Sequence, residues 1–116
     1  FDAALAANVL GVVQPDLAKW GGFSGTLPVA QRIRAAGVRY CPHYLGGGIG
    51  LLASAHLLAA VGGDGLLEID SNPNPLRSEI CGPLTMIVGG RTTLPAEPGL
   101  GIEPDLAALS GFARPH

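Results

Sequence analysis

Three acid or base side chains recur at nearly equal intervals along this chain of 116 residues, with 27 positions from Asp16 to His43 and 25 from His43 to Glu68. Each belongs to a short run of the kind that forms a β-strand; the runs are residues 12–16, 38–43 and 66–70. Such intervals fit a repeat of strand, loop, helix and return turn, because parallel strands need crossover connections of about a dozen residues or more. In a parallel β/α array the three side chains would lie at one rim, where active sites form.

The pairing of a histidine with a carboxylate makes this rim a candidate for proton transfer. A carboxylate held against one ring nitrogen fixes the tautomer and makes the other nitrogen a better base. Asp16 ends the run that precedes the run of His43, so these two residues are the expected pair. A lone histidine at a strand end would more simply be a hydrogen-bonded core residue, and a purely structural pair of Asp and His remains the alternative.

Four motifs follow one another along the chain. They are QPDLAKWGG at residues 14–22, PHY at 42–44 before a glycine run, LEID at 67–70 and PGLGI at 98–102. Together they resemble the C-terminal part of the enolase superfamily, in its mandelate racemase and muconate lactonizing enzyme family. Because position 16 is Asp rather than Lys, the chain resembles the mandelate racemase branch of that family. The resemblance covers essentially the whole chain.

The fold that this resemblance implies is α/β, the C-terminal portion of a TIM-type (β/α) barrel with about three β/α units. Residues 1–80 would supply the last strands and helices, the sixth to eighth strands of the barrel. Residues 81–116 would form a hairpin and a helix that close the barrel and pack on a smaller capping domain. Because a complete barrel needs about 250 residues, we expect the N-terminal part of the barrel as a partner of this chain.

The resemblance also implies a chemistry, in which a divalent metal, usually magnesium, holds a carboxylate substrate while a base removes its α-proton. His43 would be that base and Asp16 its partner. Glu68, kept protonated by its surroundings, would donate a hydrogen bond to the enediolate oxygen, with an ordinary carboxylate paired with a cation as the alternative. The metal ligands of the family belong to earlier strands, so we expect them outside this chain.

The glycine-rich stretch after His43 is expected to be a tight rim loop that lets the substrate approach the base, with Tyr44 and Gly46 contacting the substrate. A phosphate-binding loop is disfavoured because the chain contains neither a GKT or GKS sequence nor a dinucleotide fingerprint. The predicted reaction is the dehydration of an acid sugar through an enediolate. Racemisation or epimerisation, which needs a second base on an earlier strand, and an inactive half-barrel that associates with itself remain the alternatives.

The composition limits the partners of the chain. A net charge of −2 and a pI of about 5.8 leave no basic surface for nucleic acid or an anionic membrane. No apolar run is long enough to span a membrane and no signal peptide opens the chain, so we expect a cytoplasmic protein. Charged residues make up 14%, against about 25% in ordinary domains, so several faces should be covered, and we expect a homo-oligomer.

Apolar residues at spacings of three and four predict a helix over residues 25–36, with Pro28 in its first turn and Gly37 as its stop. The almost wholly apolar residues 50–61 predict a second helix that is buried on most sides. We further expect the tail of a helix in residues 1–10, a hairpin around Gly89-Gly90 and a helix over 104–109. Other expectations are buried thiols at Cys41 and Cys81, a packed core residue at His56, a turn residue at Asp70 and no chemistry at Lys19.

Overall fold

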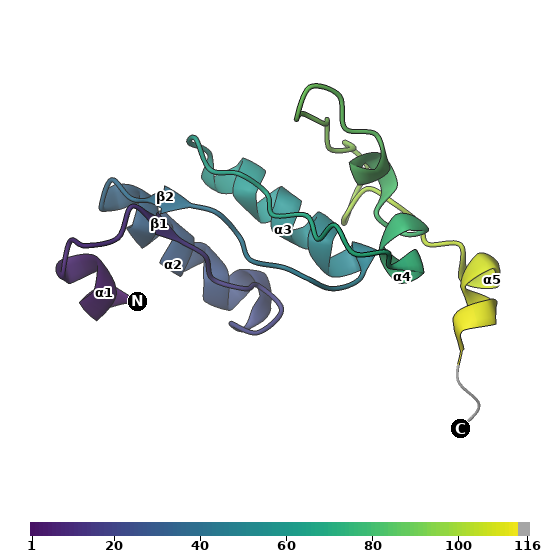
Figure 1. Ribbon diagram of the computed structural model, residues 1–116, viewed down its shortest axis with the longest axis horizontal. Coiled ribbons are helices and arrows are strands. Elements are labelled where there is room, and N and C mark those ends of the chain that lie inside the picture. Colours follow the sequence, from purple (N-terminus) through teal and green to yellow (C-terminus); the bar gives the residue numbers. More distant parts are fainter. Residues whose placement is uncertain (114–116) are drawn as a thin grey trace.

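Two short parallel strands form the sheet of the computed structural model, which describes residues 1–113 (Figure 1). Strand β1 (Val12–Val13) pairs with β2 (Arg39–Tyr40), with Val12 opposite Arg39 and Val13 opposite Tyr40. The backbone pairing continues past the strands, because the N–H of Cys41 donates to the Val13 carbonyl at 3.2 Å and that of His43 donates to the Pro15 carbonyl at 3.4 Å. The first two predicted strand runs are therefore confirmed, and their ends lie side by side.

Helix α2 (Gly22–Ala35) connects the two strands, and it ends just before Gly37, the residue predicted to stop it. Gly37 has a left-handed φ of +72° and donates to the Arg34 carbonyl, while Val38 donates to the Ile33 carbonyl, so both hydrogen bonds of a Schellman motif are present. The placement of Pro28 in the first turn was wrong, because the helix begins three residues earlier than predicted and Pro28 lies inside it. The missing N–H of proline removes one helical hydrogen bond, a cost that burial of the helix against the sheet must offset.

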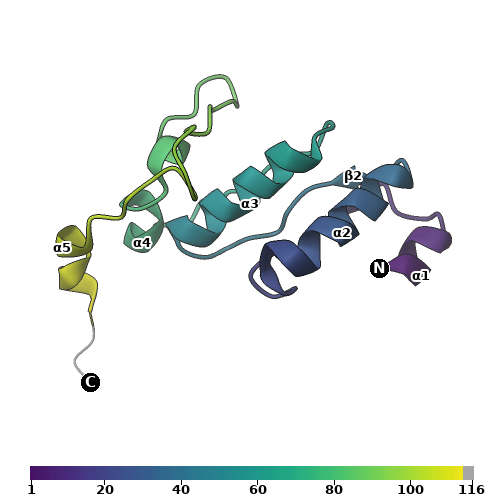
Figure 2. The same ribbon diagram turned by 180° about the vertical axis from the view of Figure 1, so that it is seen from behind.

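Helix α3 (Gly48–Val61) follows β2 and begins two residues before the predicted start. Its first turns are buried on several sides, and in Figures 1 and 2 it lies between α2 and the C-terminal segment. Ala59 and Ala60, near its end, are exposed. The predicted burial on most sides therefore holds for the first turns of the helix and not for its last turn.

The third predicted strand, residues 66–70, is extended but forms no strand ladder within the described chain. It runs beside the end of β2: the N–H of Leu66 donates to the Cys41 sulfur at 3.3 Å, and a Cβ added to Gly65 would lie 1.9 Å from the Tyr40 carbonyl oxygen. The strand prediction is thus corrected. An alternating apolar run gives an extended chain, but a ladder also requires backbone partners, and here a sulfur atom accepts the hydrogen bond.

The rest of the chain consists of short elements. These are α1 (Asp2–Ala6), α4 (Pro75–Ser78), η1 (Gly82–Thr85), α5 (Leu106–Leu109) and η2 (Ser110–Phe112). Helices are therefore present within both predicted terminal segments. The predicted hairpin is reduced to one antiparallel bridge between Val88 and Arg91, around two glycines with positive φ. With α5 at the far end of the molecule, the radius of gyration of 15.4 Å exceeds the roughly 13 Å of a compact chain of this length (Figure 1).

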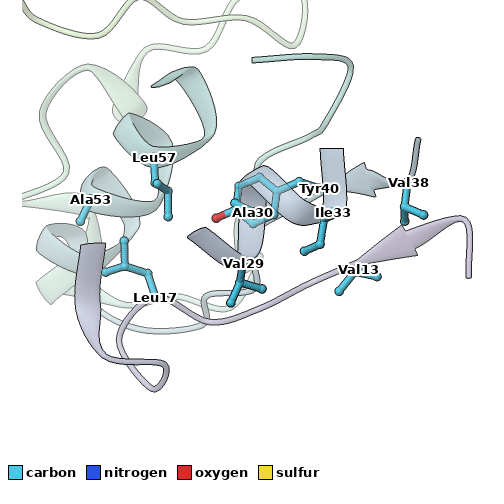
Figure 3. Packing of buried hydrophobic residues seen from close by; sticks show 9 residues of the cluster. All are labelled: Val13, Leu17, Val29, Ala30, Ile33, Val38, Tyr40, Ala53 and Leu57. Atoms are coloured by element: carbon cyan, nitrogen blue, oxygen red, sulfur yellow. The ribbon is translucent and has the colours of Figure 1, made fainter. Parts of the chain in front are cut away.

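Two hydrophobic clusters hold the elements together. The first, shown in Figure 3, lies between the strands, α2 and one side of α3; its members are Val13, Leu17, Val29, Ala30, Ile33, Val38, Tyr40, Ala53 and Leu57. The second joins α3 to the segment after α4; its members are Leu51, Leu52, Ala55, Cys81 and Leu84. Both cysteines are buried and free, as predicted, and burial raises the pKa of the Cys81 thiol. No helix within residues 1–113 has the length and apolar character needed to cross a membrane.

Candidate active site

His43 and Glu68 form the closest contact between acid and base side chains at the rim. The Nδ1 atom of His43 lies 2.5 Å from Oε2 of Glu68, and the backbone N–H of Tyr44 donates to the same oxygen at 3.3 Å. His43 is the third residue after β2, and Glu68 lies on the extended segment that runs beside the end of that strand. The two side chains are 35% and 36% exposed, so a small molecule can approach the pair from solvent.

The Glu68 carboxylate fixes the orientation of the imidazole ring. A carboxylate at Nδ1 favours the tautomer in which Nδ1 carries the proton, which leaves Nε2 free to accept one. Nε2 of His43 has no hydrogen-bond partner among the described residues. This arrangement can therefore remove a proton from a bound molecule and stabilise the imidazolium that results.

Asp16 lies at the neighbouring strand end, but its carboxylate is engaged within its own turn. Oδ1 accepts a hydrogen bond from the N–H of Ala18 at 2.8 Å, and Oδ2 forms an ion pair with Nζ of Lys19 at 2.8 Å. The Asp16 side chain is only 8% exposed. This burial by itself would raise the pKa of Asp16, but the hydrogen bonds and charge from Lys19 and the N–H of Ala18 outweigh it and hold the pKa below its ordinary value.

The structure differs from the sequence-based expectation in the partner of His43. The expected hydrogen bond between Asp16 and His43 is not formed, although the two residues end adjacent strands. The short aspartate side chain finds a donor two residues away and a cation three residues away. The longer glutamate side chain reaches across from the next segment and takes the Nδ1 position.

Two basic side chains near the rim have roles that the sequence reasoning missed. Lys19 was assigned no chemistry, and the structure gives it the ion pair with Asp16 described above. Arg77 holds the loop after Glu68: its guanidinium lies 3.5 Å from Oδ2 of Asp70 and donates to the Asn72 carbonyl. The separation of three residues between Asp16 and Lys19 was visible in the sequence, whereas the loop that brings Arg77 back to Asp70 was not.

The other singled-out residues take structural positions. Asp70 is a turn residue as predicted, since its Oδ1 accepts hydrogen bonds from the backbone N–H and the side-chain amide of Asn72, which lower its pKa. His56 is partly buried on α3, and one of its ring nitrogens lies 3.1 Å from the Leu100 carbonyl, in agreement with a packing role. Tyr44 and Gly46 contact each other in the loop before α3. Their contact with a substrate stays a prediction.

The carboxylates of the rim do not form a metal site. Within residues 1–113, no group of three His, Cys, Asp or Glu side chains stands close enough together to hold a metal ion. Glu68, Asp16 and Asp70 are each engaged by donors of the protein itself, as described above. The described residues therefore do not by themselves make a complete site for the magnesium ion that the resemblance implies.

Comparisons with known proteins agree with the α/β fold class and identify the family of the chain. A sequence model described as enolase C-terminal domain-like matches residues 1–108. A D-galactarolactone cycloisomerase of Agrobacterium fabrum is 35% identical over 97% of this chain and 32% of its own length. An arabinonate dehydratase of Saccharolobus solfataricus is 30% identical over 87% of this chain and 27% of its own length. The structure of a mandelate racemase/muconate lactonizing enzyme from Bordetella bronchiseptica RB50 is 63% identical with a TM-score of 0.89, covering 97% of this chain and 32% of that one. The chain thus spans about a third of these relatives.

Proposed function

Because the chain belongs to the enolase C-terminal domain-like family, we propose that it is part of an enzyme that removes the α-proton of a sugar acid or of its lactone. In that family this domain is the (β/α) barrel part. The observation that carries the proposal is the His43–Glu68 contact at the rim. Removal of such a proton leaves an enediolate, and a base whose tautomer and orientation are already fixed lowers the barrier to that step.

His43 acts as the base through Nε2 in this proposal, and Glu68 fixes the ring through Nδ1. The Glu68 carboxylate stabilises the imidazolium formed when the proton is taken up. Asp16 is the second carboxylate of the same rim, and the resemblance assigns it the place at Nδ1 that Glu68 holds in the structure. If Asp16 takes that place in the complete enzyme, Glu68 is released to donate a hydrogen bond to the enediolate oxygen, the role that the resemblance implies for it.

The names of the two relatives suggest two alternative reactions, dehydration and lactone isomerisation, and both can begin with removal of the α-proton. Once the α-proton is gone, the oxygen on the neighbouring β-carbon can leave with the electron pair. If that oxygen is a free hydroxyl, it takes up a proton and departs as water, which is a dehydration. If it belongs to a lactone ring, it stays attached through the rest of the molecule, and the net reaction is an isomerisation. We propose the acid-sugar dehydratase first and, from the 35% identity to the cycloisomerase, the lactone isomerase second.

The partners of the chain are proposed with the reaction. The aligned regions cover 32% and 27% of the two relatives, which supports an N-terminal part of the barrel as the partner that supplies the metal ligands. Large apolar side chains such as Val9, Val12 and Val88 are exposed, which supports coverage by further protein surface. We propose that the complete enzyme is a cytoplasmic homo-oligomer. It would act on a carboxylate substrate with magnesium as its cofactor.

The test is hydrogen exchange at the α-carbon. The full-length gene product is incubated with sugar acids and their lactones in deuterated, magnesium-containing buffer, and deuterium uptake is followed by NMR and mass spectrometry. We expect uptake by the parent protein and a loss of about 10²-fold or more in His43→Asn, because the base is gone. His56→Asn, which changes the histidine on α3, is the matched control and should exchange like the parent. Equal exchange by His43→Asn and the parent would refute the assignment of the base.

The products of the same incubation separate the two finer reactions. Loss of one water from the substrate identifies the dehydratase, and an unchanged molecular formula with an opened ring identifies the isomerase. Inversion at the α-carbon without loss of water would instead support a racemase or epimerase.

A further inference from the structure

We infer that Tyr44 is a positioning residue of the His43–Glu68 pair, and that Gly46 and Gly50 are glycines because the Tyr44 ring lies between them. The inference deepens the proposed function and rests on His43 being the base. It gives the glycine run after His43 a mechanical role in place of a phosphate-binding one.

The tip of the Tyr44 ring is seated between two glycines. A Cβ added to Gly46 would lie 2.4 Å from the Tyr44 hydroxyl oxygen, and a Cβ added to Gly50 would lie 2.2 Å from the same atom and from the carbon that bears it. Real Cβ atoms essentially never approach a neighbour this closely. Either substitution would therefore displace the ring.

The backbone conformation gives no other reason for glycine at these two positions. Neither Gly46 nor Gly50 has a positive φ, so an L-amino acid could adopt the backbone of both. Gly50 also lies in the first turn of α3, where alanine would favour the helix over glycine. Space for the Tyr44 ring is thus what the two glycines provide.

The seated ring fixes the backbone that holds Glu68. The ring packs against the second hydrophobic cluster, and the N–H of the same residue donates to Oε2 of Glu68 at 3.3 Å. Glu68 lies on the extended segment that forms no strand ladder within the described chain, so no backbone pairing there fixes its direction. Its carboxylate is instead held by two donors from adjacent residues, Nδ1 of His43 and the N–H of Tyr44. A displaced ring would move the second donor and loosen the first.

Four variants of the full-length gene product test this inference: Gly50→Ala, Tyr44→Ala, their double variant and Tyr44→Phe. Histidine-selective ¹⁵N NMR reports the His43 tautomer, and deuterium uptake at the α-carbon reports exchange. We expect Gly50→Ala to lose the uniform Nδ1–H tautomer and to slow exchange by about tenfold or more, since misplaced catalytic groups lose rate steeply. Tyr44→Phe keeps the ring and its packing against the second hydrophobic cluster, so it should retain the uniform Nδ1–H tautomer of the parent.

The double variant gives the decisive comparison. Once Tyr44→Ala has removed the ring, adding Gly50→Ala should change neither the tautomer nor the exchange rate any further. Gly47→Ala is the control in the same loop, because a Cβ there would meet its nearest neighbour at an ordinary 3.4 Å. The inference is overturned if Gly50→Ala leaves the His43 tautomer unchanged, or if it is as harmful without the Tyr44 ring as with it. Altered tautomers together with undiminished exchange in His43→Asn would instead retain the positioning role and reject the proposed function.

Discussion

The turn after β1 and the segment after α3 place similar carboxylates at one rim and satisfy them in opposite ways. The Asp16 carboxylate finds its partners within three residues, at Ala18 and Lys19, and the side chain is 8% exposed. The Glu68 carboxylate finds its partners 24 and 25 residues away, at Tyr44 and His43, and the side chain is 36% exposed. The first carboxylate completes a local turn, whereas the second joins two segments of the chain.

This difference separates stability from chemistry. A carboxylate satisfied within its own turn contributes to folding wherever that turn forms. A carboxylate that reaches a distant imidazole depends on the whole fold, and it controls which ring nitrogen faces solvent. Substitutions of Glu68 should therefore lower mainly the rate of deuterium exchange, and substitutions of Asp16 should lower mainly the free energy of unfolding.

The largest expected effect is that of Glu68→Gln on exchange. The neutral amide cannot stabilise an imidazolium and does not enforce one tautomer, so deuterium uptake at the α-carbon should fall by about 10²–10⁴-fold. The free energy of unfolding should change little, because the side chain is more than one-third exposed. Uptake within about tenfold of the parent rate would show that Glu68 does not control His43.

Substitution of Asp16 is expected to show the reverse pattern. Asp16→Ala removes a charge-assisted hydrogen bond and leaves the Ala18 N–H without its acceptor, which should lower the free energy of unfolding in urea by about 1–3 kcal/mol. Asp16→Asn keeps the acceptor and should exchange within about tenfold of the parent. If Asp16→Asn instead slows exchange as much as Glu68→Gln, then Asp16 is the partner of His43 in the complete enzyme, as the family resemblance implies.

The smallest expected effect is a dependence of stability on acid pH. Because the folded state lowers the pKa of Asp16, its contribution is present above the ordinary value of 3.8 and is lost as the pH falls through the lowered value. Unfolding in urea followed from pH 6 to pH 3 should therefore show a steeper loss of stability in the parent than in Asp16→Asn. Lys19→Met is the matched control: it should cost at most about 1 kcal/mol near neutral pH, because Lys19 is 73% exposed, and it should flatten the same acid slope. Parallel acid slopes in the parent and both variants would contradict the lowered pKa.

The sequence alone determined the local elements that carry their own signals. The spacing of apolar residues predicted α2 and α3, Gly37 predicted the end of α2, and Asp70 was predicted as a turn residue; each of these depends on neighbours within a few positions. The family and the α/β fold class were also recognisable, because four motifs stand in order along the chain. Pro28 was misplaced because proline marks a first turn only when the start of the helix is known, and Gly22 gave no clear start signal.

Only the tertiary structure decided which groups meet. The sequence placed Asp16, His43 and Glu68 at one rim, but it could not rank two carboxylates as partners of one imidazole. That ranking depends on side-chain length, on the competing donor and cation that Asp16 finds in its own turn, and on how closely residues 65–66 approach the end of β2. The seating of Tyr44 between Gly46 and Gly50 has the same origin, since it is a distance between atoms that no spacing along the chain encodes.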